Sequence, residues 1–174
     1  VPPVSHLFTG GTAQARARLS RFLDERFKRY DNNRKRPETD DVTHLGMYLH
    51  FGQISPTYVA LRVLESSASK KLKDSFIEEL VVRRELAVNF VHYTSKYDSY
   101  SCLPDWARKT LAQHKDDERE YCYTRRQLET ARTHDRYWNA AMRELRYTGY
   151  MHNYMRMYWG KKILEWMETP SYAY

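Results

Sequence analysis

Glu79 and Arg83 have the types and the spacing to do chemistry in this 174-residue sequence. They lie four residues apart in an otherwise apolar segment that continues to Leu86 and Phe90. On a helix this spacing places both charges on one face, where we expect them to pair or to bind a ligand. An ordinary salt bridge between two helices fits the same spacing.

A second group of candidate residues is aromatic. Trp159 and Trp166 lie seven residues apart, so we expect their indoles on one helix face, about 10 Å apart along the axis. Trp138, which precedes them across Gly149, could lie beside or between them. Such a stripe belongs to a hydrophobic core more often than to an electron-transfer chain. Arg156 lies among these residues with no acid within one helical turn, so we expect a buried guanidinium with an anionic partner from elsewhere.

Several other chemistries are missing from the sequence. It contains no GxxxxGK[ST], GxGxxG, HExxH or GxSxG motif. The seven histidines and the two cysteines, Cys102 and Cys122, are scattered, so we expect neither a metal site nor a disulfide. No apolar run approaches the ~18 residues of a membrane span, and no signal sequence is visible. We therefore expect an intracellular protein without membrane contact.

Positive charge is concentrated toward the two ends of the chain. The net charge is +7. Residues 1–40 contain nine basic and five acidic residues, and residues 125–162 contain nine and three, whereas residues 65–120 contain ten and eleven. A polyanion would meet the end segments, but a solvated basic surface explains the charge equally well.

The elements that must position these residues are helices. Six glycines, few β-branched runs and long stretches of 3.6-residue periodicity predict an all-α protein. Ser55 before Pro56 and Asp135 before an apolar stripe are typical helix starts, and Gly149 is a helix stop. We expect helices over 12–30, 56–65, 71–93, 104–114, 124–131, 135–148 and 150–167.

Four segments resemble a known family. Tyr30 and Arg34, followed by Asp40–Ser55, are similar to the flavin-binding loop of photolyases. Three further segments resemble the class II cyclobutane pyrimidine dimer (CPD) photolyases, in the same order and over essentially the whole chain: Glu78–Phe90, Thr133–Ala141 and Met151–Trp166.

This resemblance implies a fold and a function. The fold is the helical FAD-binding domain of the photolyase and cryptochrome type, here over residues 1–174. In that family an α/β antenna domain precedes this region and further helices follow it, so the resemblance implies a truncated domain. The implied enzyme is a deoxyribodipyrimidine photo-lyase, a carbon–carbon lyase that uses light and reduced FAD to repair CPDs in DNA. We expect a monomer, in the cytoplasm or, in a eukaryote, in the nucleus.

The resemblance also implies a role for individual residues. Glu79 would bind the thymine edge of the dimer and stabilise its radical anion, and Arg83 and Met157 would line the lesion pocket. Trp159, Trp138 and Trp166 would carry electrons to oxidised flavin, with Trp159 nearest the ring. FAD would be held by Tyr30, Arg34, Val42, Thr43, His44, Leu45, Gly46, Asn153 and Arg156.

Two positions depart from the family pattern. The loop reads Thr43-His44-Leu45-Gly46 where many relatives have Ser-Asn-Leu-Ser, which removes a hydroxyl that could bind a phosphate. Arg83 occupies a position where some relatives have a tryptophan that packs on the lesion. Two alternatives remain open: a cryptochrome-like flavin photoreceptor, and a flavin-free helical module that binds DNA through its basic residues.

Overall fold

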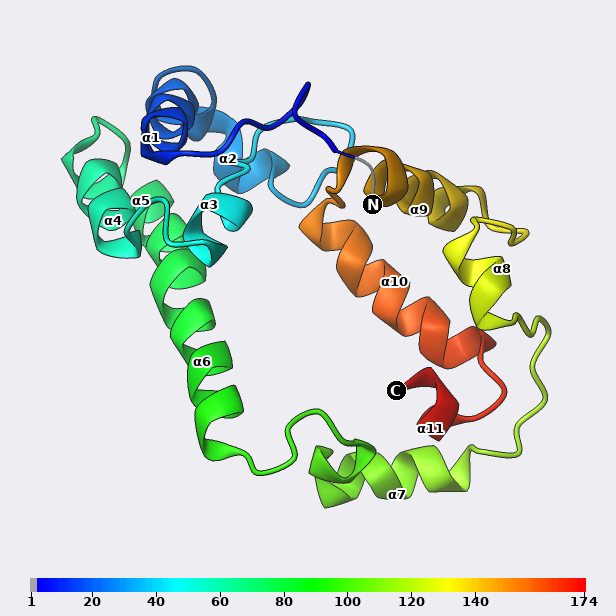
Figure 1. Cartoon of the computed structure of the whole chain (residues 1–174). Coiled ribbons are helices and arrows are strands. Elements are labelled where there is room, and N and C mark those ends of the chain that lie inside the picture. Colours follow the sequence, from blue (N-terminus) through cyan, green and yellow to red (C-terminus); the bar gives the residue numbers. More distant parts are fainter. Residues whose placement is uncertain (1–2) are drawn as a thin grey trace. The chain divides into compact units, whose positions relative to one another are not determined.

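The computed structural model describes residues 3–174, and within this range the regular elements are all helices (Figure 1). The chain forms two compact units. The N-terminal unit comprises residues 5–90, and the C-terminal unit comprises residues 91–174 together with residues 3 and 4. The sequence predicted an all-α protein, and the structure confirms it.

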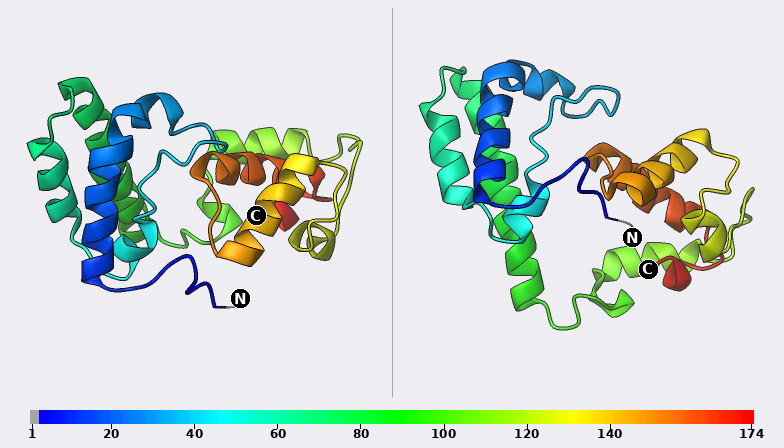
Figure 2. Two further views of the ribbon diagram at one scale, coloured as in Figure 1. Left: turned by 90° about the horizontal axis from the view of Figure 1, so that it is seen from above. Right: turned by 45° about the horizontal axis from the view of Figure 1, so that its top comes forward.

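The N-terminal unit is built from two long interrupted helices and two short ones. The first long helix consists of α1 (Thr12–Arg21), η1 (Phe22–Arg26) and α2 (Phe27–Asn33), and the short helices are α3 (Gly46–His50) and α4 (Pro56–Glu65). The second long helix consists of α5 (Lys70–Ile77), η2 (Glu78–Arg83) and α6 (Arg84–Tyr93). Helix α5 packs against α2 and α4 (Figure 2).

Each long helix contains a π-helical turn in its middle, which the sequence analysis did not predict. In the first helix the buried side chains of Phe22 and Phe27 lie five residues apart, a spacing that an α-helix would place on different faces. A π turn, with its bond from residue i to i+5, aligns them, and the Phe27 N–H donates to the Phe22 carbonyl. The π turn therefore lets the aromatic stripe continue from α1 into α2.

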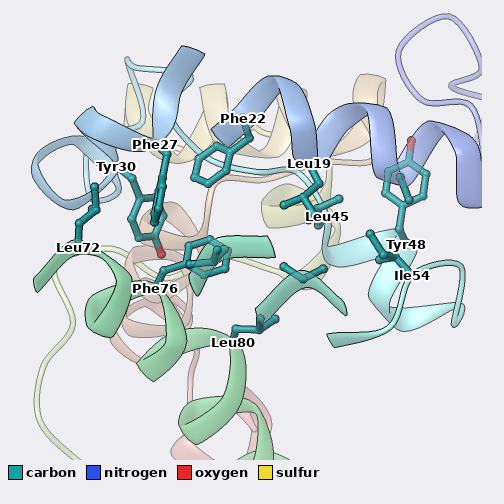
Figure 3. Packing of buried hydrophobic residues seen from close by; sticks show 13 residues of the cluster. Leu19, Phe22, Phe27, Tyr30, Leu45, Tyr48, Ile54, Leu72, Phe76 and Leu80 are labelled. Carbon is teal, nitrogen blue, oxygen red and sulfur yellow. The ribbon is translucent and has the colours of Figure 1, made fainter. Parts of the chain in front are cut away.

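Phe22 lies in the centre of the core of this unit. Its ring centroid is 5.4 Å from that of Phe27 and 5.8 Å from those of Tyr30 and Phe76. Figure 3 shows these rings converging between the two long helices, and the same core continues through Leu19 and Leu45 to Tyr48 and Ile54. The core therefore fixes α1 and α2 against α5, and it also holds the segment that leads into α3.

The C-terminal unit contains shorter helices joined by longer connections. The elements are η3 (Tyr100–Cys102), α7 (Asp105–Gln113), α8 (Arg125–Glu129), α9 (Arg136–Thr148), α10 (Asn153–Trp166) and α11 (Pro170–Ala173). Helix α10 packs against α9 and α11. A core that includes Leu128, Trp138, Met151 and Trp166 joins α8, α9 and α10.

Local signals explain most helix ends. The Asp135 side chain accepts from the backbone N–H groups of Tyr137 and Trp138, and Gly149 ends α9 at φ 69°. This left-handed residue redirects the chain, so α10 begins at Asn153 and not at residue 150 as predicted. Pro170 starts α11, which the sequence analysis did not predict.

Within residues 3–174, no helix is both long and apolar enough to cross a bilayer.

Replacing Phe22 by alanine tests the importance of the aromatic core. We expect the free energy of unfolding to fall by about 3–5 kcal/mol, because the change removes a ring with three aromatic neighbours and leaves a cavity. Leu61→Ala, at a side chain on α4 that is 53% exposed, is the control and should change it by less than about 1 kcal/mol. Urea unfolding followed by circular dichroism measures both, and equal effects would contradict the packing described above.

Candidate functional site

The segment predicted to bind flavin begins at a carboxylate that α2 holds in place. Asp41 is buried, and its carboxylate accepts from Arg29 Nη2 at 2.7 Å and from Asn33 Nδ2 at 2.6 Å. Arg29 and Asn33 lie one turn apart on α2, so both donors reach the same group. The hydrogen bond from Arg29, helped by that from Asn33, lowers the pKa of Asp41 against the opposing effect of burial. This ionised carboxylate fixes the loop to α2.

Asp40 and His44 shape the rest of the loop. The Asp40 carboxylate lies 2.5 Å from Arg26 Nη1 and 2.5 Å from His44 Nε2. Burial opposes ionisation of Asp40, but the hydrogen bond with His44 and the charge of Arg26 outweigh it, so its pKa is lowered. His44 has a φ of 52°, a left-handed conformation that non-glycine residues adopt mainly where surrounding contacts enforce it. Leu45 follows and is buried in the core.

A basic cavity opens beside this loop. Its volume is about 190 Å³, and its wall includes the apolar side chains of Leu7, Phe8 and Phe22. Its three arginines outnumber its one carboxylate, which suits an anion such as a phosphate. The charged and loop residues in its wall are Arg18, Arg21, Arg26, Asp40, Val42, Thr43 and His44. Gly46 begins α3 with open space where a Cβ would lie.

Arg34 joins the predicted flavin residues to the predicted lesion residue. Its Nη1 lies 2.6 Å from Glu79 Oε1, and its guanidinium carbon lies 5.8 Å from the centroid of the Tyr30 ring. The hydrogen bond with Glu79 raises the pKa of Arg34, and burial raises the pKa of Tyr30. The Glu79 side chain remains 42% exposed, so it can still accept a ligand hydrogen bond.

Glu79 and Arg83 do not pair with each other, and the salt bridge of Glu79 joins the two long helices, which was the alternative interpretation of the spacing. Arg83 Nε lies 3.1 Å from Glu78 Oε1, while Glu79 pairs with Arg34. The cause is the π turn, in which residues five apart become neighbours, so the four-residue spacing no longer brings side chains together. Arg83 remains on the surface with a side chain that is 64% exposed.

In the C-terminal unit, the three tryptophans form a row of ring contacts, called the tryptophan stack below, in which Trp138 stacks on Trp159 and meets Trp166 edge-on. The Trp138 ring lies between the other two, with its centroid 5.6 Å from that of Trp159 and 5.4 Å from that of Trp166. Trp138 and Trp166 are 1% exposed, and Trp138 Nε1 donates to the Leu128 carbonyl. Trp159 Nε1 is buried and has no hydrogen-bond partner within residues 3–174. The predicted proximity of the three indoles is therefore confirmed.

Three other predicted residues share one exposed face of α10. Asn153, Arg156 and Met157 are spaced by three and four residues, and all three are exposed. Arg156 Nε donates to the Met151 carbonyl at 3.1 Å. The expectation of a buried Arg156 is wrong, because the residue lies in the first turn of α10 and is exposed.

One carboxylate ties α10 to α9. Asp135 Oδ1 caps α9, and Asp135 Oδ2 accepts from the Tyr158 hydroxyl of α10. Burial, and then this hydrogen bond, raise the pKa of Tyr158. The contact fixes the half of α10 that carries Trp159.

The aromatic contacts continue beyond the residues singled out from the sequence. Tyr123 and His134 both contact the Trp166 ring, at centroid distances of 5.5 and 5.3 Å. Tyr121 stacks on His134 at 3.7 Å. The closely spaced Tyr121 and Tyr123 in the sequence were the available signal, but their contact with His134 depends on tertiary folding.

The predicted site residues belong to both units. Tyr30, Arg34, Glu79, Arg83 and residues 42–46 lie in the N-terminal unit, whereas Asn153, Arg156, Met157 and the three tryptophans lie in the C-terminal unit. Residues 3–174 contain no cluster of His, Cys, Asp or Glu that could hold a metal ion. Cys102 and Cys122 are free.

Asp41→Asn tests the anchoring of the loop. At neutral pH we expect the free energy of unfolding to fall by about 1 kcal/mol, because the charge-assisted hydrogen bonds weaken and Arg29 is partly exposed. The folded-state pKa of Asp41 is lowered, so its stabilisation is present above the unfolded-state pKa and is lost as the pH falls through the folded-state value.

The difference between Asp41→Asn and wild type should therefore disappear in acid. Urea unfolding across a pH series measures it, with Asp74→Asn at an exposed pair with Lys70 as the control. A difference that is independent of pH would contradict the role of the ionised carboxylate.

Comparison with known proteins gives clear sequence relatives. No protein-family model matches the sequence. The chain is 52% identical over 168 residues to the deoxyribodipyrimidine photo-lyase of Methanothermobacter thermautotrophicus, covering 97% of this chain and 37% of that protein. It is 51% identical over 154 residues to the deoxyribodipyrimidine photo-lyase of Oryza sativa subsp. japonica, covering 87% of this chain and 30% of that protein.

A solved structure has the same fold. The crystal structure of a bacterial class III photolyase from Agrobacterium tumefaciens matches with a TM-score of 0.70 at 18% identity, covering 98% of this chain and 38% of that chain. The chain thus spans between 30 and 38% of the length of these relatives. Over that part of their length, the chain is homologous to the deoxyribodipyrimidine photo-lyases.

Proposed function

We propose that this chain is the helical FAD-binding part of a class II CPD photolyase and takes part in light-driven repair of pyrimidine dimers in DNA. The observation that carries the proposal is the tryptophan stack, in a chain about half identical to photo-lyases. A hydrophobic core needs buried apolar area but no continuous row of indoles, whereas electron transfer needs such a row. The residues proposed for cofactor, lesion and electron transfer belong to one functional domain over residues 1–174.

The chemistry of the proposed cofactor residues fits FAD. When bound, reduced FAD supplies the electron that splits the dimer. Two buried N–H groups, Arg34 Nε and Trp159 Nε1, lack a hydrogen-bond partner within the described residues, and a ligand acceptor would remove that cost of about 1–3 kcal/mol. The guanidinium groups beside the loop offer positive charge for the phosphates. Tyr30, Arg34 and residues 42–46 would hold the cofactor, together with Asn153 and Arg156.

Glu79, Arg83 and Met157 would bind the flipped-out lesion. Arg34 holds the Glu79 side chain in one position and leaves part of it exposed, which suits a hydrogen bond to a thymine edge. Arg83 is exposed and could stack on a base, and Met157 is 51% exposed and offers an apolar contact. The basic balance of the chain would supply the sequence-independent contacts with DNA phosphates. The proposed protein acts as a monomer inside the cell, in the cytoplasm or the nucleus.

The tryptophan stack would restore the reduced cofactor. An electron passes from Trp166 through Trp138 to Trp159, and each transfer crosses rings whose centroids lie less than 6 Å apart. Trp138 and Trp166 are shielded from water, which protects their radicals from side reactions. In this proposal Trp159 faces the flavin.

Glu79→Gln tests the lesion contact. We expect repair per absorbed photon to fall about 10- to 100-fold, because a charged hydrogen bond contributes about 1.5–3 kcal/mol. The measurement uses the full-length protein with chemically reduced FAD and a CPD-containing oligonucleotide. Glu85→Gln, a neighbouring glutamate paired with Arg84, is the matched control and should repair normally.

Unchanged repair by the Glu79→Gln variant would remove this residue from the lesion site. A protein that binds and photoreduces flavin but does not distinguish damaged from intact DNA would support a signalling photoreceptor instead. Salt-sensitive DNA binding without flavin would support the flavin-free module.

Trp159→Phe tests the electron path. Photoreduction of bound oxidised FAD should be lost, whereas repair by chemically reduced protein should persist, because repair does not use the stack. Trp106→Phe, at a side chain on α7 that is 74% exposed, should reduce flavin like wild type. Flavin absorbance confirms equal loading, and normal photoreduction by the Trp159 variant would refute the path.

A further inference from the structure

A tyrosine–histidine pair lies at the far end of the tryptophan stack. The Tyr123 ring meets the Trp166 ring edge-on, with centroids 5.5 Å apart and planes at 77°. The His134 ring lies 5.3 Å from Trp166. The row of aromatic contacts that begins at Trp159 thus ends outside the buried indoles, at a partly exposed phenol and an exposed imidazole.

Two hydrogen bonds join the pair. The Tyr123 hydroxyl oxygen lies 2.7 Å from His134 Nδ1. The same oxygen accepts from the His134 backbone N–H at 3.0 Å. When the imidazole carries its proton on Nε2, Nδ1 is an acceptor and the phenol donates to it, and the proton transfer described below requires this tautomer.

The pair is held in place from several sides. Tyr121 stacks on the His134 ring, with centroids 3.7 Å apart and planes at 16°. The Tyr123 N–H donates to the Trp166 carbonyl at 3.0 Å. The Arg119 guanidinium donates to the Leu164 and Glu165 carbonyls, which fixes the incoming segment to the end of α10. If Trp166 is oxidised, an ordered electron donor, Tyr123, therefore lies in contact with its ring.

We propose that Tyr123 is the terminal electron donor of the tryptophan stack and that His134 accepts its proton. This inference rests on the proposed function, in which photoexcited oxidised FAD withdraws one electron from the stack. The Trp166 radical cation then takes one electron from the Tyr123 phenol and returns to its closed-shell form. The O–H bond of Tyr123 breaks, and the proton passes to His134 Nδ1.

The products of this step are a neutral tyrosyl radical and an imidazolium ion. A phenol loses its proton on oxidation, and imidazole is the side chain that takes up a proton most readily near neutral pH. The proton bound to Nδ1 returns to the phenoxyl oxygen when an external thiolate supplies one electron and itself becomes a thiyl radical. The step places the positive charge on His134, and three indoles separate the pair from the proposed flavin position. Return of the electron from the flavin to Tyr123 therefore becomes slow.

A test that needs no flavin uses direct photoionisation of tryptophan. The chain has four tryptophans, and Trp106→Phe leaves the three of the stack. In this background, laser excitation at the red edge of tryptophan absorption, with a scavenger for the ejected electrons, should give a tryptophanyl signal. That signal should decay as a tyrosyl absorption band rises.

Adding Tyr123→Phe to this background should remove most of the tyrosyl band. Adding Trp166→Phe should also remove most of the band, because it removes the ring through which Tyr123 passes its electron to the stack. Adding Tyr147→Phe, which removes a hydroxyl at a side chain on α9 that is 72% exposed, should leave the band unchanged. Far-UV circular dichroism verifies that each variant is folded. A tyrosyl yield that is the same with and without the Tyr123 hydroxyl would overturn the proposal.

The role of His134 has its own readout. With His134→Gln the tyrosyl band should rise about tenfold more slowly or more, because the general base is lost while Tyr123 remains. D₂O should slow the rise of the tyrosyl band in the Trp106→Phe background. After His134→Gln is added, the rise should be equally fast in H₂O and in D₂O. An unchanged rate in His134→Gln would exclude the imidazole as proton acceptor.

Failure of this inference can be told apart from failure of the proposed function. If photoionisation yields the Tyr123 radical but bound FAD is not photoreduced, the donor pair stands and the photolyase assignment of this chain fails. If FAD is photoreduced and Tyr123→Phe changes neither experiment, the electron path stands and the terminal donor is wrong.

Discussion

A π turn in each long helix of the N-terminal unit determines which side chains face one another. The π turn at Phe22 lets the aromatic stripe continue to Phe27, so the buried residues of α2 pack into the same core as those of α1. The second π turn, at residues 78–83, breaks the usual pairing along its own helix and directs Glu79 toward Arg34 at the end of α2. π turns cost hydrogen-bond quality and are found mostly at functional positions. In this chain both lie next to the residues proposed to bind cofactor and lesion.

Trp138 has the corresponding position in the C-terminal unit. Its indole contacts both other members of the stack, and its N–H is bonded to the carbonyl of Leu128. Asp135 caps α9 three residues before Trp138. The start of the helix therefore fixes the position of the Trp138 ring in the core. Stability and the proposed electron path therefore depend on the same packing. A change that loosened the core would also lengthen the gaps between rings.

The sequence predicted what is encoded locally. Caps such as Asp135 and stops such as Gly149 placed the helix ends. The spacing of Trp159 and Trp166 put both indoles on one face of a helix, with room for Trp138 between them. The sequence failed where the contacts are tertiary or the helix is irregular. The four-residue spacing of Glu79 and Arg83 did not identify their partners, because α-helical periodicity does not apply across a π turn. Tyr123 lies in the connection before α8, and His134 lies in the connection between α8 and α9. Neither connection is periodic, so the sequence pattern does not predict their contact.

The carboxylate of Asp135 restricts what evolution can place at the start of α9. Serine, threonine and asparagine are all good helix caps, and each could replace its Oδ1. None of them also offers the second, anionic oxygen that receives the Tyr158 hydroxyl from the neighbouring helix. A residue that caps one helix and joins it to another has two sets of requirements to meet. Position 135 should therefore drift far less among homologous sequences than an ordinary surface cap, and Tyr158 should vary together with it.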